Sequence, residues 1–309
     1  MNPLLSILCI TYNHDKFISE AIDSWLEQKI EFQIEIIIAD DCSTDNTVLE
    51  IKKYLKSNNN IKLIERSKNI GFINNFIKTY KKCTGKYIAI CEGDDYWSDK
   101  NKLQMQVTFL ENNNNYVLTH TNSLVYDMIK NIKYTLKKKW ITDENNIIQI
   151  NQITTHTAVF RNTNIDFENK WNHFKMADWP LWINLSTQGR FKFFDELTGV
   201  YRLNPTGVWQ NGWNDAIGSD RLLNEIVVLK YFLKQKKFNS KKIRISIISR
   251  LIRVFEFNYN YHSYLHNLKL FYPRYLFTNS KLFKIYCFSF FIYLKTKIKD
   301  TIILNDFKN

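Results

Sequence analysis

The sequence of 309 residues contains only 8 glycines and 4 prolines. No Gly-x-Gly-x-x-Gly and no Gly-x-x-x-x-Gly-Lys-Ser/Thr pattern follows any segment that predicts a strand. Both patterns hold phosphates with the backbone N–H groups of a glycine-rich turn. Their absence argues against a dinucleotide-binding fold and against a P-loop enzyme.

The five cysteines are odd in number and scattered, with neither a pairing pattern nor zinc spacing. We therefore expect free thiols in a reducing compartment. The N-terminus has no basic region followed by an apolar stretch, so no signal peptide is expected. Near the C-terminus the apolar segment 285–294 is much shorter than the roughly 20 residues that a membrane-spanning helix needs. These features predict a cytoplasmic protein.

The net charge of +13 is concentrated near the C-terminus. Residues 241–309 contain 13 Lys and Arg against 3 Asp and Glu, a balance of +10 that leaves +3 for the first 240 residues. A basic, aromatic-rich helical region could lie on an anionic membrane surface, or it could pack on the domain with its basic face in water. We find no nucleic-acid-binding module in it and expect no nucleic-acid partner.

The first 97 residues alternate between apolar runs and amphipathic segments. The runs that predict strands are 4–11, 34–39, 61–65 and 87–91, and the segments with helical spacing are 16–29, 44–55 and 71–83. Strands that alternate with helices predict a parallel sheet with right-handed crossovers and helices on both faces.

After residue 97 the pattern changes to hairpins and short strands, and then to helices. We expect helices over 100–111, 178–188, 215–236, 241–261 and 281–299, and strands over 117–126, 131–137, 154–161, 190–194 and 198–203. The expected fold is α/β, with a mixed, mainly parallel sheet flanked by helices and a C-terminal helical appendage. The expected domains are 1–212, with halves 1–97 and 98–212, and a basic helical region 213–309.

Three carboxylates, Glu92, Asp94 and Asp95, follow directly after the run at 87–91. Like charges this close repel one another unless a cation lies between them. Mg²⁺ or Mn²⁺ would accept these oxygens and keep positions open for water and phosphates. The alternative is a solvated turn with a helix cap at Asp95 or Ser98. Because parallel strands end at one edge, polar residues after the other strands would lie near this turn.

These polar segments, taken in order, resemble the motifs of family 2 glycosyltransferases over roughly residues 4–210. The matching segments are Thr11-Tyr12-Asn13, Ala39-Asp40-Asp41-Cys42-Ser43-Thr44-Asp45, Asn69-x-Gly71, Cys91-Glu92-Gly93-Asp94-Asp95-Tyr96-Trp97, Ala177-Asp178-Trp179-Pro180-Leu181, and Val200-Tyr201-Arg202 through Gly207-Val208-Trp209. The resemblance implies a Rossmann-like GT-A fold and a nucleotide-diphosphate sugar as donor, most often a UDP-sugar.

The resemblance also implies a role for each matching residue. Asp40 or Asp41 would hold uracil and ribose, and Thr11 and Tyr12 would line the base pocket. The other residues implied in donor binding are Asn13, Arg66, Asn69, Glu92, Asp94, Asp95, Trp179 and Arg202. Among them, Glu92, Asp94 and Asp95 would bind the metal. Trp179 would form a wall of the sugar pocket, and Arg202 would face the diphosphate.

Asp178 would be the general base by the same resemblance, and residue chemistry agrees with that role. Displacement with inversion needs a carboxylate that deprotonates the acceptor hydroxyl opposite the leaving group. The departing nucleoside diphosphate needs a metal or other cations. Simple N-capping of a helix is the alternative for Asp178.

Two positions depart from the family pattern. Glu92 begins the acidic motif in place of Asp, and Asn204 stands where many relatives carry a histidine two residues after Arg202. His156, expected on a strand, could contact the acceptor or be a buried structural histidine. Trp209 and Trp213 could stack on sugar rings or belong to the core.

Together these observations predict an inverting glycosyltransferase that uses Mn²⁺ or Mg²⁺. It would transfer a single sugar from a UDP-hexose, such as UDP-glucose, UDP-galactose or an N-acetylhexosamine, to a glycan or a lipid-linked oligosaccharide. The basic C-terminal region would place it on the inner face of the cytoplasmic membrane. The alternatives are a catalytically inactive scaffold and a sugar nucleotidyltransferase, although the latter needs a glycine-rich loop where Tyr12-Asn13-His14-Asp15 stands.

Overall fold

A computed structural model describes residues 3–135, 147–204, 215–235 and 238–258 of the chain. The chain divides into two compact units. The first comprises Met1–Gly212 and Val227–Ile243, and the second comprises Trp213–Ile226 and Arg244–Asn309. The first unit contains the predicted site.

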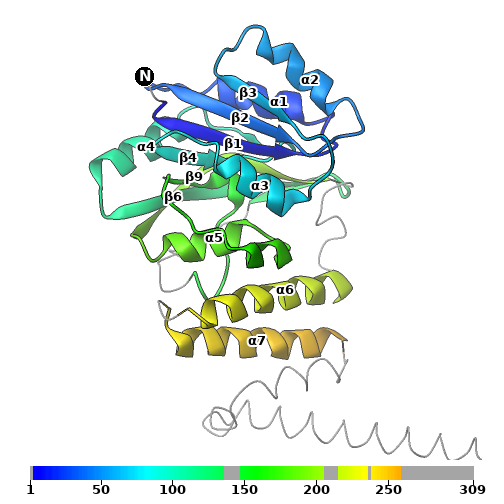
Figure 1. The fold of residues 1–309 in the computed structure, drawn as a ribbon, viewed down its shortest axis with the longest axis vertical. Helices are drawn as coiled ribbons and strands as arrows, with labels where there is room; N and C mark the ends of the chain where they lie inside the picture. Colours follow the sequence, from blue (N-terminus) through cyan, green and yellow to red (C-terminus); the bar gives the residue numbers. More distant parts are fainter. Residues whose placement is uncertain (1–2, 136–146, 205–214, 236–237, 259–309) are drawn as a thin grey trace, which may run out of the picture. The chain divides into compact units, whose positions relative to one another are not determined.

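The first unit begins with four parallel strands and three intervening helices (Figure 1). The strands are β1 (Leu5–Thr11), β2 (Ile34–Asp40), β3 (Ile61–Glu65) and β4 (Tyr87–Ile90), and the helices are α1 (Ile18–Leu26), α2 (Thr47–Leu55) and α3 (Phe72–Tyr80). Every neighbouring pair of these strands is parallel, as predicted. Their order in the sheet is β3-β2-β1-β4. Each helix is shorter than its predicted range, because residues at one or both ends of the range belong to the adjoining loops.

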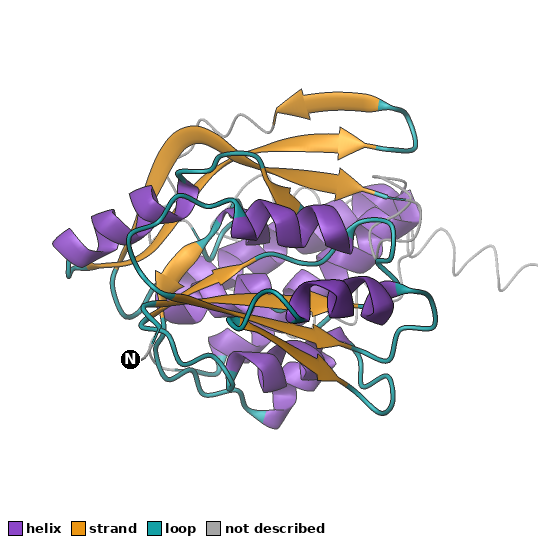
Figure 2. Ribbon diagram, turned by 90° about the horizontal axis from the view of Figure 1, so that it is seen from above, coloured by secondary structure: helices purple, strands orange, loops and turns teal. Residues whose placement is uncertain are grey.

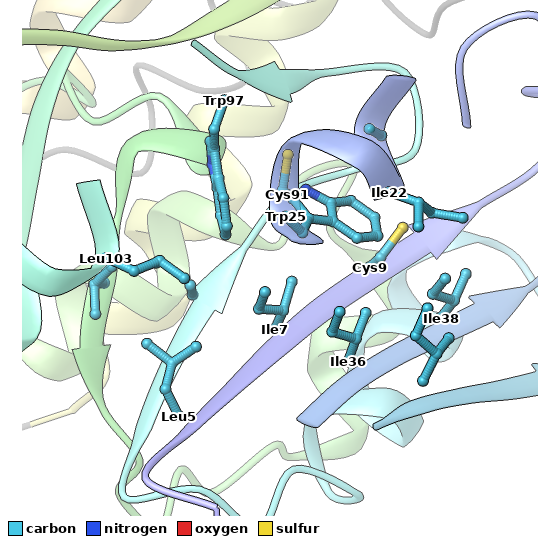
Figure 3. Packing of buried hydrophobic residues seen from close by; sticks show 14 of the residues in the cluster. Leu5, Ile7, Cys9, Ile22, Trp25, Ile36, Ile38, Cys91, Trp97 and Leu103 are labelled. Carbon is cyan, nitrogen blue, oxygen red and sulfur yellow. The ribbon is translucent and has the colours of Figure 1, made fainter. Parts of the chain in front are cut away.

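Alternate side chains of the strands build the core on one face of this sheet. Leu5, Ile7 and Cys9 of β1 are fully buried there with Trp25 of α1 (Figure 3). The cluster also includes residues of α2 and of α4 (Lys102–Asn112). Helix α3 contributes nothing to this cluster but contacts β1 and β2, so it covers the opposite face. Each buried aliphatic side chain contributes about 1.5–3 kcal/mol to folding.

The strand order reverses beside β1. From β1 the chain continues through β2 to β3 on one side, whereas β4 returns to the other side of β1. In open α/β sheets such a reversal opens a crevice between the carboxyl ends of the two strands, and ligands bind there. The segments that follow β1 and β4, which begin at Tyr12 and Cys91, border this crevice.

The second half of the first unit extends the same sheet (Figure 2). Its strands are β5 (Tyr96–Trp97), β6 (Tyr116–Asp127), β7 (Ile132–Thr135), β8 (Val159–Arg161) and β9 (Arg190–Leu203). The order continues from β4 through β8, β6 and β9 to β5, with β7 beside β6. In this half the pair β6–β9 is parallel. The antiparallel pairs are β4–β8, β6–β8, β6–β7 and β5–β9. The fold is therefore mixed α/β.

Three local predictions differ from the structure. Residues 154–161 form a short 3₁₀ helix, Thr155–Thr157, before β8, because both the N–H and the hydroxyl of Thr157 bond back to the carbonyl of Thr154. The strands predicted at 190–194 and 198–203 are one strand, β9, whose polar middle fits irregularities in its register with β6. β5 was not predicted, since two residues carry no periodicity.

Helices α6 (Asp215–Leu233) and α7 (Ser240–Asn258) follow, close to the predicted ranges. Within the second unit, the guanidinium of Arg250 on α7 donates to Glu225 on α6 at 2.6 Å. None of the described helices combines the length and the apolarity needed to cross a membrane. The helix predicted at 281–299, as well as Trp209 and Trp213, lies outside the described residues.

Candidate active site

The carboxyl ends of the parallel strands bring the predicted polar residues to one edge. Thr11 of β1 lies beside Asp40 of β2, and the Thr11 carbonyl accepts from the Asp41 N–H at 2.9 Å. The Arg66 N–H donates to the Asp40 carbonyl at 3.0 Å, and the Gly93 N–H to that of Ile10 at 3.3 Å. Sequence segments more than 80 positions apart, such as Ile10 and Gly93, thus form one surface, as predicted from a parallel sheet.

The loops after β1 and β2 are bonded to each other. The Asn13 N–H donates to the Ser43 hydroxyl at 2.9 Å, and the Asn13 side-chain oxygen accepts from the Thr44 N–H at 2.8 Å. The His14 N–H donates to the Thr47 hydroxyl at 2.7 Å. Asn13 and Cys42 adopt left-handed backbone conformations, with φ of 57° and 66°. Asparagine tolerates this region better than most residues, and the cross-loop bonds fix the conformation.

The two aspartates after β2 also stabilise these loops. Asp40, 1% exposed, accepts from the Ser43 N–H at 2.8 Å, and Asp41, 4% exposed, accepts from the Ile70 N–H at 2.8 Å. The Asn69 side chain accepts from the Gly71 N–H at 3.0 Å. In contrast, the Tyr12 side chain is 43% exposed. Of these residues, Tyr12 offers the open surface on which a base could stack.

Arg66 points toward α3. Its Nε donates to the Asn75 side-chain oxygen at 3.0 Å, and its Nη2 to the Thr79 hydroxyl at 3.4 Å. The half-buried guanidinium therefore lies against α3 with part of its donors already used.

We call residues 92–95, which follow β4, the acidic turn. Within it, Asp95 is buried and is bonded to residues of the second half of the unit. Its Oδ1 accepts from the Arg202 N–H at 2.9 Å, and its Oδ2 lies 3.1 Å from Nδ1 of His156. Burial, and then the charge of Asp94, raise the pKa of the Asp95 carboxyl well above its ordinary value, although Arg202 opposes the rise. Both oxygens of Asp95 face protein groups.

His156 is the partner of Asp95 and is itself fully buried. Its Nε2 lies 2.8 Å from the Ser123 hydroxyl, and its carbonyl accepts from the Trp97 indole at 2.8 Å. A Cβ on Gly199 would lie only 2.6 Å from the imidazole ring. Of the two roles left open by the sequence, the structure supports the structural histidine, on the 3₁₀ helix before β8 and not on a strand.

Arg202 is 5% exposed and lies among protein partners. Its Nη1 donates to the Asp94 carbonyl at 2.7 Å, and its Nη2 pairs with the carboxylate of Glu20 on α1. The guanidinium also lies 4.3 Å from the centre of the Tyr96 ring. Arg202 therefore stabilises the backbone of the acidic turn through its bond to the Asp94 carbonyl, and its positive charge stabilises the carboxylates around it.

Asp178 begins α5 (Asp178–Leu185) and is half-buried. Its Oδ2 accepts from the Asn151 amide at 2.6 Å, and the helix has no side-chain cap. Trp179 beside it is fully buried, and its indole donates to the Ile147 carbonyl at 2.6 Å. The alternative of N-capping by Asp178 is therefore not observed, and its carboxylate is held by another side chain.

The charges of the acidic turn and of Asp178 act on the same carboxyl group, that of Glu92. Burial, and then the charges of Asp95 and Asp94, raise the pKa of Glu92 well above its ordinary value. The charge of Asp178 adds to this rise. Asp178, from the second half of the sheet, therefore lies close enough to the turn after β4 for its charge to act on Glu92.

A divalent cation fits this region if the donor supplies part of its coordination. Among the described residues, no three His, Cys, Asp or Glu side chains are arranged to hold an ion by themselves. Mg²⁺ in phosphate-transfer sites commonly takes one or two protein carboxylates and completes its shell with phosphates and water. Asp94 suits that role because its side chain is 19% exposed, whereas Asp95 is turned inward. Mutual repulsion of the carboxylates would be relieved by a cation.

Several contacts at the site were not predicted from the sequence. Glu20 contacts Arg202, and Asn151 contacts Asp178. His14 and Asn204 both contact Asp94. Glu20 and Asn151 stand in segments without a motif, so no local signal marks them. His14 follows the Thr11-Tyr12-Asn13 segment directly, and its place at a strand end was the available signal.

The arrangement defines the GT-A fold, in which a Rossmann-like parallel half continues into a mixed sheet. S. aureus TarS in complex with UDP has this fold, with a TM-score of 0.61 and 19% identity over 84% of this chain and 73% of that one. The mannosyltransferase PcManGT from Pyrobaculum calidifontis, in complex with GDP-Man and Mn²⁺, gives 0.58 and 12% over 95% and 81%.

Sequence comparison gives the family. Residues 6–176 match the model of glycosyl transferase family 2, and the chain belongs to this family. An uncharacterized protein of Mycobacterium tuberculosis is 32% identical over 68% of this chain, which spans 62% of that relative's length. The UDP-Glc:alpha-D-GlcNAc-diphosphoundecaprenol beta-1,3-glucosyltransferase WfgD of Escherichia coli is 32% identical over 44% of this chain and 54% of its own.

Proposed function

We propose that this protein is an inverting glycosyltransferase that transfers a single sugar from a nucleotide-diphosphate sugar to a glycan or lipid-linked acceptor. The observation that carries the proposal is the common field of Asp178 and the acidic turn. Direct displacement requires a base near the place where the donor's diphosphate is held. Family membership and the fold of the solved glycosyltransferases support the same reaction.

The residues divide the work between the two halves of the sheet. Asp40 and Asp41, with Tyr12 and Thr11, would form the nucleoside pocket. Asp94, reaching solvent beside Glu92, would hold Mn²⁺ or Mg²⁺. The ion supplies positive charge that stabilises the departing diphosphate.

Asp178 would remove the proton from the acceptor hydroxyl. Asn151, which donates to its Oδ2 at 2.6 Å, holds the carboxylate in a fixed orientation. Trp179 and Arg202 would then hold the site residues in place and would not contact the substrates, because both side chains are buried. Trp179 anchors the start of α5, and Arg202 fixes the backbone of Asp94.

The donor is proposed to be a UDP-hexose, such as UDP-glucose, UDP-galactose or an N-acetylhexosamine. TarS is described in complex with UDP, and WfgD by its printed name uses UDP-Glc and a diphosphoundecaprenol acceptor. By analogy the acceptor would belong to cell-surface glycan assembly and be carried on a lipid. The enzyme would then meet it at the inner face of the cytoplasmic membrane.

The test is a transfer assay with a panel of UDP-, GDP-, dTDP- and CMP-sugars, offered with Mn²⁺, Mg²⁺ or EDTA, in which released nucleotide is recorded. We expect cation-dependent release from one donor, and its loss in Asp94→Ala. Asp178→Asn should lower transfer by about 10²–10⁴-fold and leave calorimetric donor binding intact. Asp166→Asn, at an exposed position, is the matched control.

An inactive scaffold is the rival, and the same panel separates the two. If no donor binds in the presence of either cation, the enzymatic proposal fails. If donors bind but Asp178→Asn transfers at the wild-type rate, Asp178 is not the base.

A further inference from the structure

We propose that His14 is a protein ligand of the divalent cation and acts together with Asp94. The inference rests on the proposed function, since it concerns the cation of the same site. It adds a nitrogen ligand from the loop after β1 to the oxygen ligand from the loop after β4.

The distance between the two side chains suits two ligands of one ion. Nε2 of His14 lies 3.8 Å from Oδ2 of Asp94. This separation is too long for a hydrogen bond. Two ligands about 2.1 Å from one ion are separated by about 3.0 Å when adjacent and about 4.2 Å when opposite. The observed 3.8 Å lies between these values, so both atoms become adjacent ligands of one ion after a side-chain rotation that brings them about 1 Å closer together. Both side chains reach the surface, with 17% and 19% of their area exposed.

The backbone of His14 is fixed on both sides. Its N–H donates to the Thr47 hydroxyl at 2.7 Å, which in turn donates to Asp45 at 2.6 Å. Its carbonyl accepts from the N–H groups of Phe17 and Ile18, both at 2.9 Å. The residue therefore has little freedom to move, as a preorganised ligand requires.

Because Gly93 has no side chain, the imidazole of His14 packs closely against the turn that follows β4. A Cβ at this position would lie 2.9 Å from Nδ1 of His14 and 2.8 Å from the hydroxyl of Thr11. Both of these polar atoms are buried and have no hydrogen-bond partner, and Thr11 is 3% exposed. The buried ring nitrogen is Nδ1, which leaves Nε2, the nitrogen that faces Asp94, as the atom that would bind the ion.

Asn204 completes the surroundings of Asp94. Its amide nitrogen donates to the same Oδ2 at 3.0 Å. The amide cannot neutralise the carboxylate, so the negative charge of Asp94 remains available to a cation. A neutral imidazole and a carboxylate on one side leave the remaining positions of the ion to phosphate oxygens and water.

The ligand set distinguishes between cations. Mg²⁺ prefers oxygen ligands, whereas imidazole is a common ligand of transition metals. His14 should therefore contribute more to the binding of Mn²⁺ than to that of Mg²⁺. The competing interpretation is a weak surface ion pair between protonated His14 and Asp94, which would involve no cation and contribute about 0–1 kcal/mol to stability.

The experiment measures Mn²⁺ binding to the full chain, alone and with UDP, by calorimetry and pulsed electron paramagnetic resonance. We expect modulation from a histidine ¹⁴N in the wild type, and a change to the ¹⁵N pattern after labelling with ¹⁵N-histidine. His14→Gln should remove the modulation and weaken Mn²⁺ binding at least about ten-fold. Mg²⁺-dependent UDP binding should change by no more than about three-fold. His173→Gln, at an exposed histidine, is the control.

Mn²⁺ binding without a nitrogen signal in the wild type would overturn the inference. So would a signal that survives in His14→Gln. The isotope-labelling measurement needs no variant, so the result does not depend on the folding of His14→Gln. If Mn²⁺ gives the nitrogen signal but UDP and every sugar donor fail to bind, the site is supported and the proposed function fails.

Discussion

Buried carboxylates at the two ends of the parallel strands have opposite pKa shifts. At the carboxyl ends, burial and like charges raise the pKa of Glu92 and Asp95. At the other end Glu35, 3% exposed, accepts hydrogen bonds from Ser6, Thr84 and Lys62. Burial alone would raise its pKa, but these hydrogen bonds outweigh burial and lower the pKa to about 2. Partners, more than burial, decide which carboxylate stays charged.

Glu35→Gln should lower the free energy of unfolding at pH 7 by about 1–3 kcal/mol, since charged hydrogen bonds are lost. Because the folded pKa lies below the ordinary value of 4.5, this stabilisation is present above pH 4.5. It disappears as the pH falls toward 2. Urea unfolding of both proteins from pH 7 to pH 2 should show their difference shrinking in that window.

Glu31→Gln, at an exposed carboxylate three residues from β2, is the control for this measurement and should unfold like the wild type. A difference between Glu35→Gln and the wild type that stays constant down to pH 2 would contradict the assignment of the pKa shift.

Helix α3 is preceded by a glycine whose backbone conformation only glycine adopts readily. Gly71, the residue before α3, has φ of 79° and ψ of 149°. Its N–H donates to Asn69, and the neighbouring Ile70 N–H donates to Asp41, so the turn links α3 to the edge of the site. A side chain at this position would meet no atom within 4 Å. Any effect of substitution is therefore an effect of the backbone.

Gly71→Ala should lower the free energy of unfolding by about 1–3 kcal/mol, the strain of a non-glycine residue in this region. Chemical denaturation measures the change. Lys81→Ala, at the exposed end of α3, should change stability by less than about 0.5 kcal/mol. Equal effects of the two substitutions would show that the turn does not require glycine.

The elements most accurately predicted are those with a long, regular pattern. β3 occupies the predicted residues, and β1 and β2 differ by one residue at an end. β5 was missed, and the segment 154–161 was assigned wholly to a strand. Tyr96–Trp97 and Val159–Arg161 are strands because β9, and β4 with β6, pair with them. Such pairing depends on the tertiary structure and not on local pattern.

The charge of the molecule is distributed unevenly along the chain, with +10 of the +13 in residues 241–309. Each Lys or Arg near an anionic membrane contributes about 1 kcal/mol to binding. This attraction weakens as the Debye length shortens from about 10 Å at 0.1 M salt to about 3 Å at 1 M. The proposed location at the inner membrane face follows from this distribution.

The full chain should co-sediment with vesicles that contain anionic lipid at low salt, and the bound fraction should fall as salt rises. Lys241→Glu with Lys242→Glu should weaken binding more than Lys56→Glu with Lys82→Glu, which changes the same charge at exposed positions outside the basic region 241–309. Equal binding to uncharged vesicles, or equal effects of the two pairs, would refute the electrostatic attachment.

The sequence by itself determined the alternation of strands and helices, the parallel direction of the first four strands and the polar residues at their carboxyl ends. Hydrophobic periodicity and chain connectivity are local properties, so one sequence suffices to predict them. The tertiary structure decided which carboxylates face outward. Asp95 meets His156, and Arg202 meets Glu20 from 182 positions away, through contacts that no spacing encodes. Side-chain direction after a turn depends on backbone angles and on partners from distant segments, and both exist only once the chain has folded.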